Sequence, residues 1–162
     1  MAGFFPTSWR PNGAALLPAD PRVYTGPGVA RVMAMVYLGL ITARSLVHLL
    51  APDGGAHSIA TINIALPGGA NIVGLFGQWG AIQLLLAGLM WVMILRYRGL
   101  TALVLATLAL EPFMRGLAGH LKPIATAGVA PGAALNWIAA PVLIATLYLA
   151  LCPAAAQGEG RR

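Results

Sequence analysis

The sequence is poor in charged residues and contains a single lysine, Lys122. Charged residues make up only 9% of its 162 positions, whereas 59% are hydrophobic. Soluble domains carry about 25% charged residues, so a core this apolar cannot be covered by the few charges present. Lipid must provide part of the solvent, and we expect an integral membrane protein.

Cysteine is nearly missing too, since Cys152 is the only one. Its isolation excludes an intramolecular disulfide and a cysteine-based metal cluster, and we interpret it as a small buried hydrophobe. The sequence also lacks a phosphate-binding loop, a nucleophile elbow and a cysteine pair. ATPase, hydrolase and thiol-redox activities therefore have no support.

The net charge of +6 does not point to nucleic acid, because the positive residues are scattered. Half of them lie at or near the two ends of the chain: Arg10, Arg22, Arg31, Arg161 and Arg162. This pattern favours an anionic membrane surface over a nucleic-acid groove.

Continuous apolar runs predict four membrane-spanning helices, at about 28–51, 71–95, 99–120 and 131–152. Each run is close to the ~20 residues that a bilayer-crossing helix needs, and continuous rather than alternating runs exclude a strand barrel. Short connections favour antiparallel neighbours. We therefore predict an all-α fold, an integral membrane four-helix up-down bundle over 28–152.

Three other segments flank or interrupt these spans. Residues 1–27 are broken by proline and glycine and predict an irregular arm rather than a cleaved signal peptide, with Phe4, Phe5 and Trp9 as candidate interfacial anchors or partner contacts. Residues 58–70 are too short to span and predict a cap or re-entrant element. Residues 153–162 form a C-terminal tail.

Positive charge predicts the orientation, because cytoplasmic loops are rich in arginine and lysine. Arginines precede the first span, fill the loop between the second and third, and follow the fourth: Arg22, Arg31, Arg96, Arg98, Arg161 and Arg162. The other two loops contain a single lysine or arginine, Lys122. We predict a multi-pass protein of the inner (plasma) membrane with both termini cytoplasmic.

Polar residues within the spans gather in the outer half of the bilayer when placed by helical rise. They are Arg44, His48, Gln78, Glu111, Arg115 and Asn136. Arg44 and His48 share one helix face by their spacing of four, as do Glu111 and Arg115. Charged groups facing lipid are costly, so we predict an outward-facing polar pocket. Two arginines face one glutamate, and an anionic or carbonyl-bearing ligand would balance the extra charge.

Two alternatives stay open for this cluster. It could be structural, with Glu111 in a buried ion pair and the amides joining helices. It could instead be catalytic, in an isomerase or oxidoreductase acting on a lipophilic substrate through Glu111 and a histidine, His48 or His120. A metal site is disfavoured, because no pair of ligands has metal-binding spacing within one helix.

The pattern of four short spans, with "GLFGQWG" opening the second and "EPFMRGLAGH" late in the third, resembles the DoxX group of small four-helix bacterial inner-membrane proteins. The resemblance covers about 28–152 and implies that some members are subunits with redox partners. It carries over no catalytic residue.

We therefore expect the pocket to bind a small amphiphilic or anionic ligand, in a ligand-binding or accessory subunit of a membrane complex. Bound quinone, pigment or lipid would fit, and the expected partners are the bilayer and other membrane subunits or copies of the chain.

Overall fold

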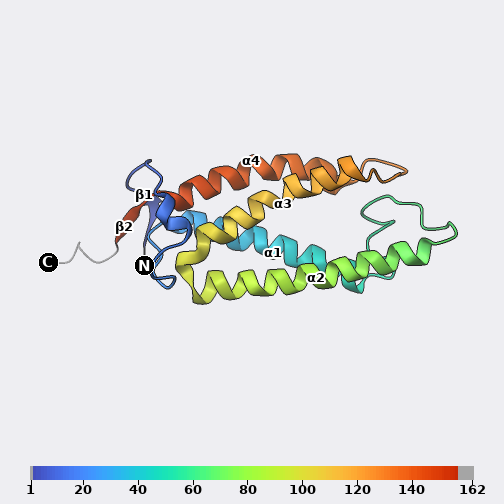
Figure 1. Cartoon of the computed structure of the whole chain (residues 1–162), viewed down its shortest axis with the longest axis horizontal. Coiled ribbons are helices and arrows are strands. Elements are labelled where there is room, and N and C mark those ends of the chain that lie inside the picture. The colour runs from blue at the N-terminus through green and yellow to red at the C-terminus, as the bar shows by residue number, and fades with distance from the viewer. Residues whose placement is uncertain (1, 157–162) are drawn as a thin grey trace.

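The computed structural model describes residues 2–156, without the side chains of residues 2, 131–134 and 156. Four helices dominate it, and consecutive helices run in opposite directions (Figure 1). The elements in chain order are β1 (Ala2–Pro6), the 3₁₀ turn η1 (Gly13–Leu16), α1 (Gly28–Leu50), α2 (Gly69–Arg96), the 3₁₀ turn η2 (Arg98–Leu100), α3 (Thr101–Leu121), α4 (Pro131–Leu151) and β2 (Ala154–Ala156). The all-α, four-helix part of the prediction is confirmed.

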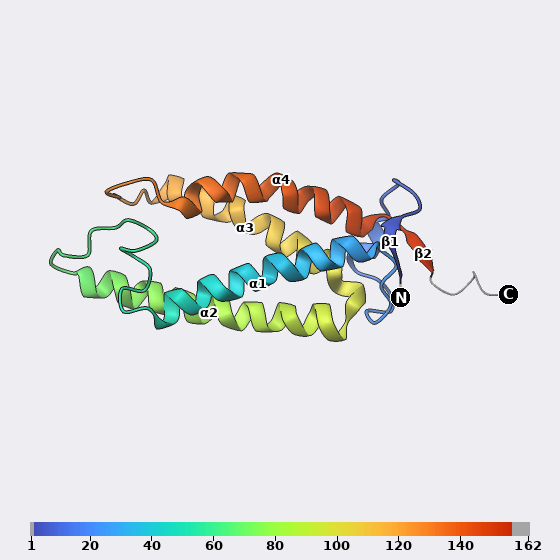
Figure 2. The same ribbon diagram turned by 180° about the vertical axis from the view of Figure 1, so that it is seen from behind.

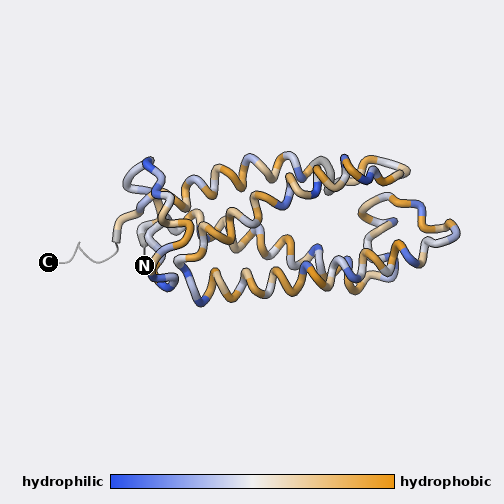
Figure 3. Tube along the Cα trace, viewed as in Figure 1, coloured by the Kyte–Doolittle hydropathy of each residue, from blue (hydrophilic) through white to orange (hydrophobic). Residues whose placement is uncertain are grey.

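Three of the helical stretches are long and apolar enough to cross a membrane: Gly28–Leu50, Gly69–Arg96 and Arg98–Leu121. Within α4, the part whose side chains are described, Leu135–Leu151, is a shorter apolar helix. Large apolar side chains project outward from these helices; Leu85 of α2, for example, is 78% exposed. Figure 3 shows this hydrophobic character along most of each helix.

The helices associate as two pairs, α1 with α2 and α3 with α4. The pairs meet at the end that holds β1 and β2, here called the terminal end, and lie further apart towards the other end (Figures 1 and 2). The buried core lies mainly at the terminal end and is built from small and branched side chains, including Ala30, Ala34, Leu38, Ile94 and Leu105. The half away from the termini therefore has the looser packing.

Gly80 allows α1 and α2 to approach closely. A Cβ atom at this position would lie 2.8 Å from the Cβ of His48 and 2.9 Å from the backbone oxygen of Ser45. Those distances are shorter than normal contacts, so any larger residue would push the helices apart. Small residues at helix interfaces are typical of membrane proteins, where close packing replaces the hydrophobic effect between helices.

The segment before α1 is more ordered than the irregular arm predicted for 1–27. Its first residues form β1, which pairs antiparallel with β2, the strand that follows α4. The pairing joins segments at opposite ends of the sequence, so no local pattern in 1–27 could reveal it. Nearby, Arg31 donates from Nε and Nη2 to the carbonyl oxygen of Ile94, near the C-terminus of α2. That end of a helix carries partial negative charge, which favours a cation there.

Turns connect α1 to α2 at the far end of the bundle, in the region where a cap or re-entrant element is predicted. The carboxylate of Asp53 accepts hydrogen bonds from the backbone N–H groups of Gly55, at 2.9 Å, and Ser58, at 2.7 Å. These bonds stabilise its charged form and lower the pKa of Asp53 to about 2. Thr61 hydrogen-bonds to Gly128, so this connection also contacts the loop before α4.

We predict that Gly80→Ala lowers the unfolding temperature of the protein in detergent, because overpacking costs about 1–3 kcal/mol. Gly88→Ala is the matched control on the same helix, since a Cβ there meets nothing within 4 Å. The control should be neutral or slightly stabilising, because alanine favours helix over glycine. Equal unfolding temperatures for the two variants would show that α1 and α2 do not pack closely at Gly80.

A second prediction concerns acid. The pKa of Asp53 is lower in the folded chain than its ordinary value of 3.8, so its contribution is complete above that value and is lost as the pH falls towards 2. Amide hydrogen exchange in residues 54–60 should therefore accelerate, relative to the helices, between pH 4 and about 2. Asp53→Asn should weaken protection at neutral pH and remove the acid step. An acid step that persists in Asp53→Asn would assign it to another group.

Candidate functional site

The centre of the site is one carboxylate shared by two arginines. Arg44 of α1 lies 3.2 Å from Glu111 Oε1 of α3, measured from Nη2. Arg115, one turn further along α3, forms an ion pair with the same oxygen through its own Nη2. The three side chains are about a quarter exposed, at 26% and 27%. The structure thus brings together three of the predicted residues.

Hydrogen-bonding capacity is left over within this cluster. Glu111 Oε2 and Arg44 Nε are both buried and have no hydrogen-bond partner among the described residues. A guanidinium has five N–H donors, so the donors of each arginine that do not bind Glu111 can bind a further acceptor group. With two cations and one anion, the cluster carries one uncompensated positive charge.

Trp79 of α2 completes the cluster and was not among the predicted site residues. Its ring centroid lies 5.8 Å from Arg44 Cζ and 5.9 Å from Arg115 Cζ. Cations at this distance from an indole ring are stabilised by its negative face. Because Trp79 contacts both arginines, it links α2 to the charges on α1 and α3.

His48 is 3% exposed and packs against the same tryptophan, with ring centroids 4.7 Å apart. Its Nδ1 lies 2.8 Å from the carbonyl oxygen of Gly54. A carbonyl can only accept, so Nδ1 carries a proton and donates it. His48 therefore ties the end of α1 to the turn that follows and supports Trp79. His48 thus bonds to this turn through Nδ1, whereas Glu111 bonds to the two arginines.

α4 contributes the buried side chain of Asn136 to this half of the bundle, and it is 7% exposed. Its Nδ2 donates to the carbonyl oxygen of Pro112 over 2.9 Å. Pro112 lies inside α3 and has no N–H, so it removes one bond of that helix. Asn136 therefore binds α4 to the turn of α3 that lies between Glu111 and Arg115 in sequence.

Gln78 and His120 are not brought into this cluster. Both side chains are exposed, Gln78 on the outer face of α2 and His120 in the last turn of α3. The amide that does face α1 belongs to Gln83, whose Oε1 accepts from Ser45 Oγ at 3.1 Å. Within the described residues, no group of three or more metal-ligating side chains gathers in one place.

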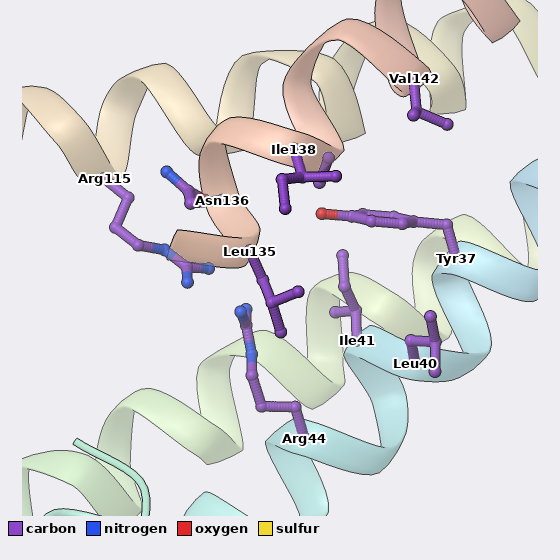
Figure 4. A pocket seen from close by; sticks show the side chains of 10 residues that line it. Tyr37, Leu40, Ile41, Arg44, Arg115, Leu135, Asn136, Ile138 and Val142 are labelled. Carbon is purple, nitrogen blue, oxygen red and sulfur yellow. The ribbon is translucent and has the colours of Figure 1, made fainter. Parts of the chain in front are cut away.

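A cavity of about 330 Å³ adjoins the arginines between α1 and α4. Arg44, Arg115 and Asn136 line one end of it, and Figure 4 shows both guanidinium groups pointing into the space between the helices. Most of the remaining wall is aliphatic, from Leu40, Ile41, Leu135, Ile138, Ala139 and Val142. The cavity is therefore amphipathic, with a cationic end and an apolar body.

Tyr37 is a second residue that was not among the predicted site residues. It lines the cavity from α1, and its hydroxyl points across the space towards Ile138 (Figure 4). Tyr37 lies seven residues before Arg44, which places the two on the same helix face about 10 Å apart along the axis. This spacing is a signal in the sequence that could have identified Tyr37.

We predict that Glu111→Gln destabilises the bundle, because it leaves Arg44 and Arg115 facing each other without an anion. Removing one partner of a fully buried pair costs about 3–5 kcal/mol. Partial exposure reduces this, so we expect about 1–3 kcal/mol, measured by thermal unfolding in detergent. Gln78→Ala, at an exposed position, should leave the unfolding temperature unchanged. If both variants unfold like the parent, the three charges do not hold the helices together.

Comparison of the chain with models of protein families, with curated proteins and with solved structures found no match. The resemblance to the DoxX group therefore stays a prediction.

Proposed function

We propose that the chain is a multi-pass membrane protein whose cavity binds a small amphiphilic or anionic ligand. The observation that carries the proposal is the cavity between α1 and α4, with two arginines at one end and an aliphatic wall along the rest. A cationic end suits an anionic or carbonyl head group, and the aliphatic wall suits the apolar remainder of the same molecule. Such a protein would serve as a ligand-binding or accessory subunit of a membrane complex.

The outward-facing side chains support placing the bundle in a bilayer. Large apolar residues cover the outer faces of all four helices, for example Leu40, Ile82, Leu110 and Ile138, each more than 60% exposed. Exposed apolar surface on this scale is unfavourable in water and favourable in lipid. α4 spans 21 residues, which is also long enough to cross.

The charge distribution supports an orientation with both termini cytoplasmic, in the inner (plasma) membrane. Arg22, Arg31, Arg96 and Arg98 lie in or beside the elements at the terminal end of the bundle (Figure 1). Among the described residues, the connections at the other end contain one basic side chain, Lys122, together with the acidic Asp53. Arginine-rich ends remain on the cytoplasmic side. Arg161 and Arg162, part of the original prediction, lie outside the described residues.

The catalytic alternative lacks a specific observation in its favour. Glu111 bonds to the arginines, His48 bonds to Gly54, and His120 is exposed. An acid–base pair needs its two groups within hydrogen-bond reach of one substrate proton. Catalysis by Glu111 and a histidine stays a prediction.

The orientation is testable by cysteine labelling of whole cells in a Cys152→Ser background. Ala65→Cys and Ala125→Cys occupy exposed positions in the two connections far from the termini, and Thr25→Cys occupies an exposed position at the terminal end. We expect a membrane-impermeant maleimide to label the first two in intact cells and the third only after lysis. Labelling of Thr25→Cys in intact cells would overturn the orientation.

Ligand binding itself is testable by native mass spectrometry of the protein released gently from its own membrane. We expect a bound amphiphile of low mass on the parent. A cavity-filling variant, Ala139→Phe, should lose it. A parent that carries no such mass, and that takes up no added amphiphile, would contradict the proposed function.

A further inference from the structure

We propose that the ligand is a single-chain amphiphile with one negative charge on its head group, which enters sideways from the bilayer between α1 and α4. This inference rests on the proposed function and names the class of molecule that the cavity would take. Charge, volume and exposure each support it separately.

The charge of the cluster selects the head group. Arg44 and Arg115 share Glu111, which leaves one positive charge unbalanced beside the cavity. A head group with a single negative charge makes the cluster neutral. A neutral head group would leave the extra positive charge unbalanced in apolar surroundings. A head group with two negative charges would instead leave one negative charge unbalanced there. The carboxylate is the simplest matching group, because its two oxygens fit the planar N–H fork of arginine.

The volume of the cavity selects a single chain. At about 330 Å³ it lies near the lower limit for ligand sites, which run from about 300 to 1,000 Å³. Arg44 lies at the polar end of the cavity and Tyr37 lies along its body, about two helical turns away on α1. One chain, lying along α1 with its head at Arg44, uses this length. The two acyl chains of a phospholipid need more room than the aliphatic wall encloses.

Exposure identifies the entrance. Leu40 and Ile138, which line the cavity from α1 and α4, are each 63% exposed on the outside of the bundle. The same side chains therefore form both the wall of the cavity and the surface that would face lipid. The apolar tail of an amphiphile dissolved in the bilayer can pass between these side chains without crossing water. Its charged head group then needs to move only as far as the arginines.

Quenching of Trp79 fluorescence provides the test, because this ring lies beside both arginines. The protein is placed in phosphatidylcholine nanodiscs and titrated with dibromostearic acid, dibromostearyl alcohol or a brominated phosphatidylcholine. The signal from Trp79 is the difference between the parent and Trp79→Phe. We expect the acid to quench it at saturation with one molecule per chain, counted by native mass spectrometry. The alcohol and the phospholipid should bind at least tenfold more weakly.

Two variants separate the head group from the chain. Arg44→Gln should lower the affinity for the acid at least tenfold and bring it close to that of the alcohol. Ala139→Phe fills the cavity and should lower the affinity to a similar degree, while Ala145→Phe, at an exposed position on the same helix outside the cavity lining, should not. Thermal unfolding without the probe checks each variant. If Arg44→Gln does not fold, two other measurements test the inference. They are the difference in acid affinity between Ala139→Phe and Ala145→Phe, and the ratio of the parent's affinities for the acid and the alcohol.

The outcomes distinguish this inference from the function on which it rests. If the alcohol or the phospholipid binds as tightly as the acid, the monoanionic single-chain class is wrong while ligand binding stands. If Ala139→Phe and Ala145→Phe bind the acid equally well, the cavity is not its site. If none of the three probes binds the parent, the inference and the proposed function both fail.

Discussion

The structure depends on one electrostatic constraint: a single carboxylate, Glu111, has to compensate two guanidinium groups within an apolar bundle. In lipid such charges are tolerated only when they pair with one another and face inward. Glu111 binds Arg44 across the helix interface and Arg115 along its own helix. Trp79 then shields both cations, and His48 supports Trp79 while fixing the turn after α1. The charges therefore position α1, α2 and α3 relative to one another in the half of the molecule where apolar packing is weakest.

The other half supplies the packing that this arrangement lacks. At the terminal end, alanines on α1 and α3 let the helices pack closely, and leucine and isoleucine side chains fill the space between them. β1 and β2 join the two chain ends there, and Arg31 binds the end of α2. Most of the buried apolar packing lies at this end, so the fold does not require close side-chain packing at the far end. A cavity can persist between α1 and α4, because the packing contacts missing there lower the local stability and leave the packing at the terminal end intact.

The sequence allowed the helices and much of the site to be predicted, for reasons that also explain what was missed. Apolar runs of about 20 residues identify spans without any knowledge of packing. Depth and the cost of charge in lipid placed Arg44, Glu111 and Arg115 in one cluster, and an ion pair of Glu111 with one of the arginines was an alternative left open. Gln78 was misplaced because depth does not specify which way a residue faces: Gln78 and its neighbour Trp79 lie at the same depth, about 100° apart around α2, and α2 is apolar on nearly every side. The pairing of β1 with β2 is non-local, so no pattern within either segment predicted it.

A purely structural role explains part of this cluster but not its composition. Arg44 and Glu111 alone would link α1 to α3 with no net charge, and Asn136 already links α4 to α3 through Pro112. Arg115 adds a second cation on the same helix as Glu111. It contacts Trp79 of α2, but this contact supplies no negative charge, so one positive charge is left without an anion. An uncompensated charge in apolar surroundings is costly. That cost falls beside a cavity whose size and lining suit a small amphiphile, and a negatively charged head group placed there would remove it. A bound anionic head group would thus balance the charge of the second arginine, which its contacts with Glu111 and Trp79 leave unbalanced.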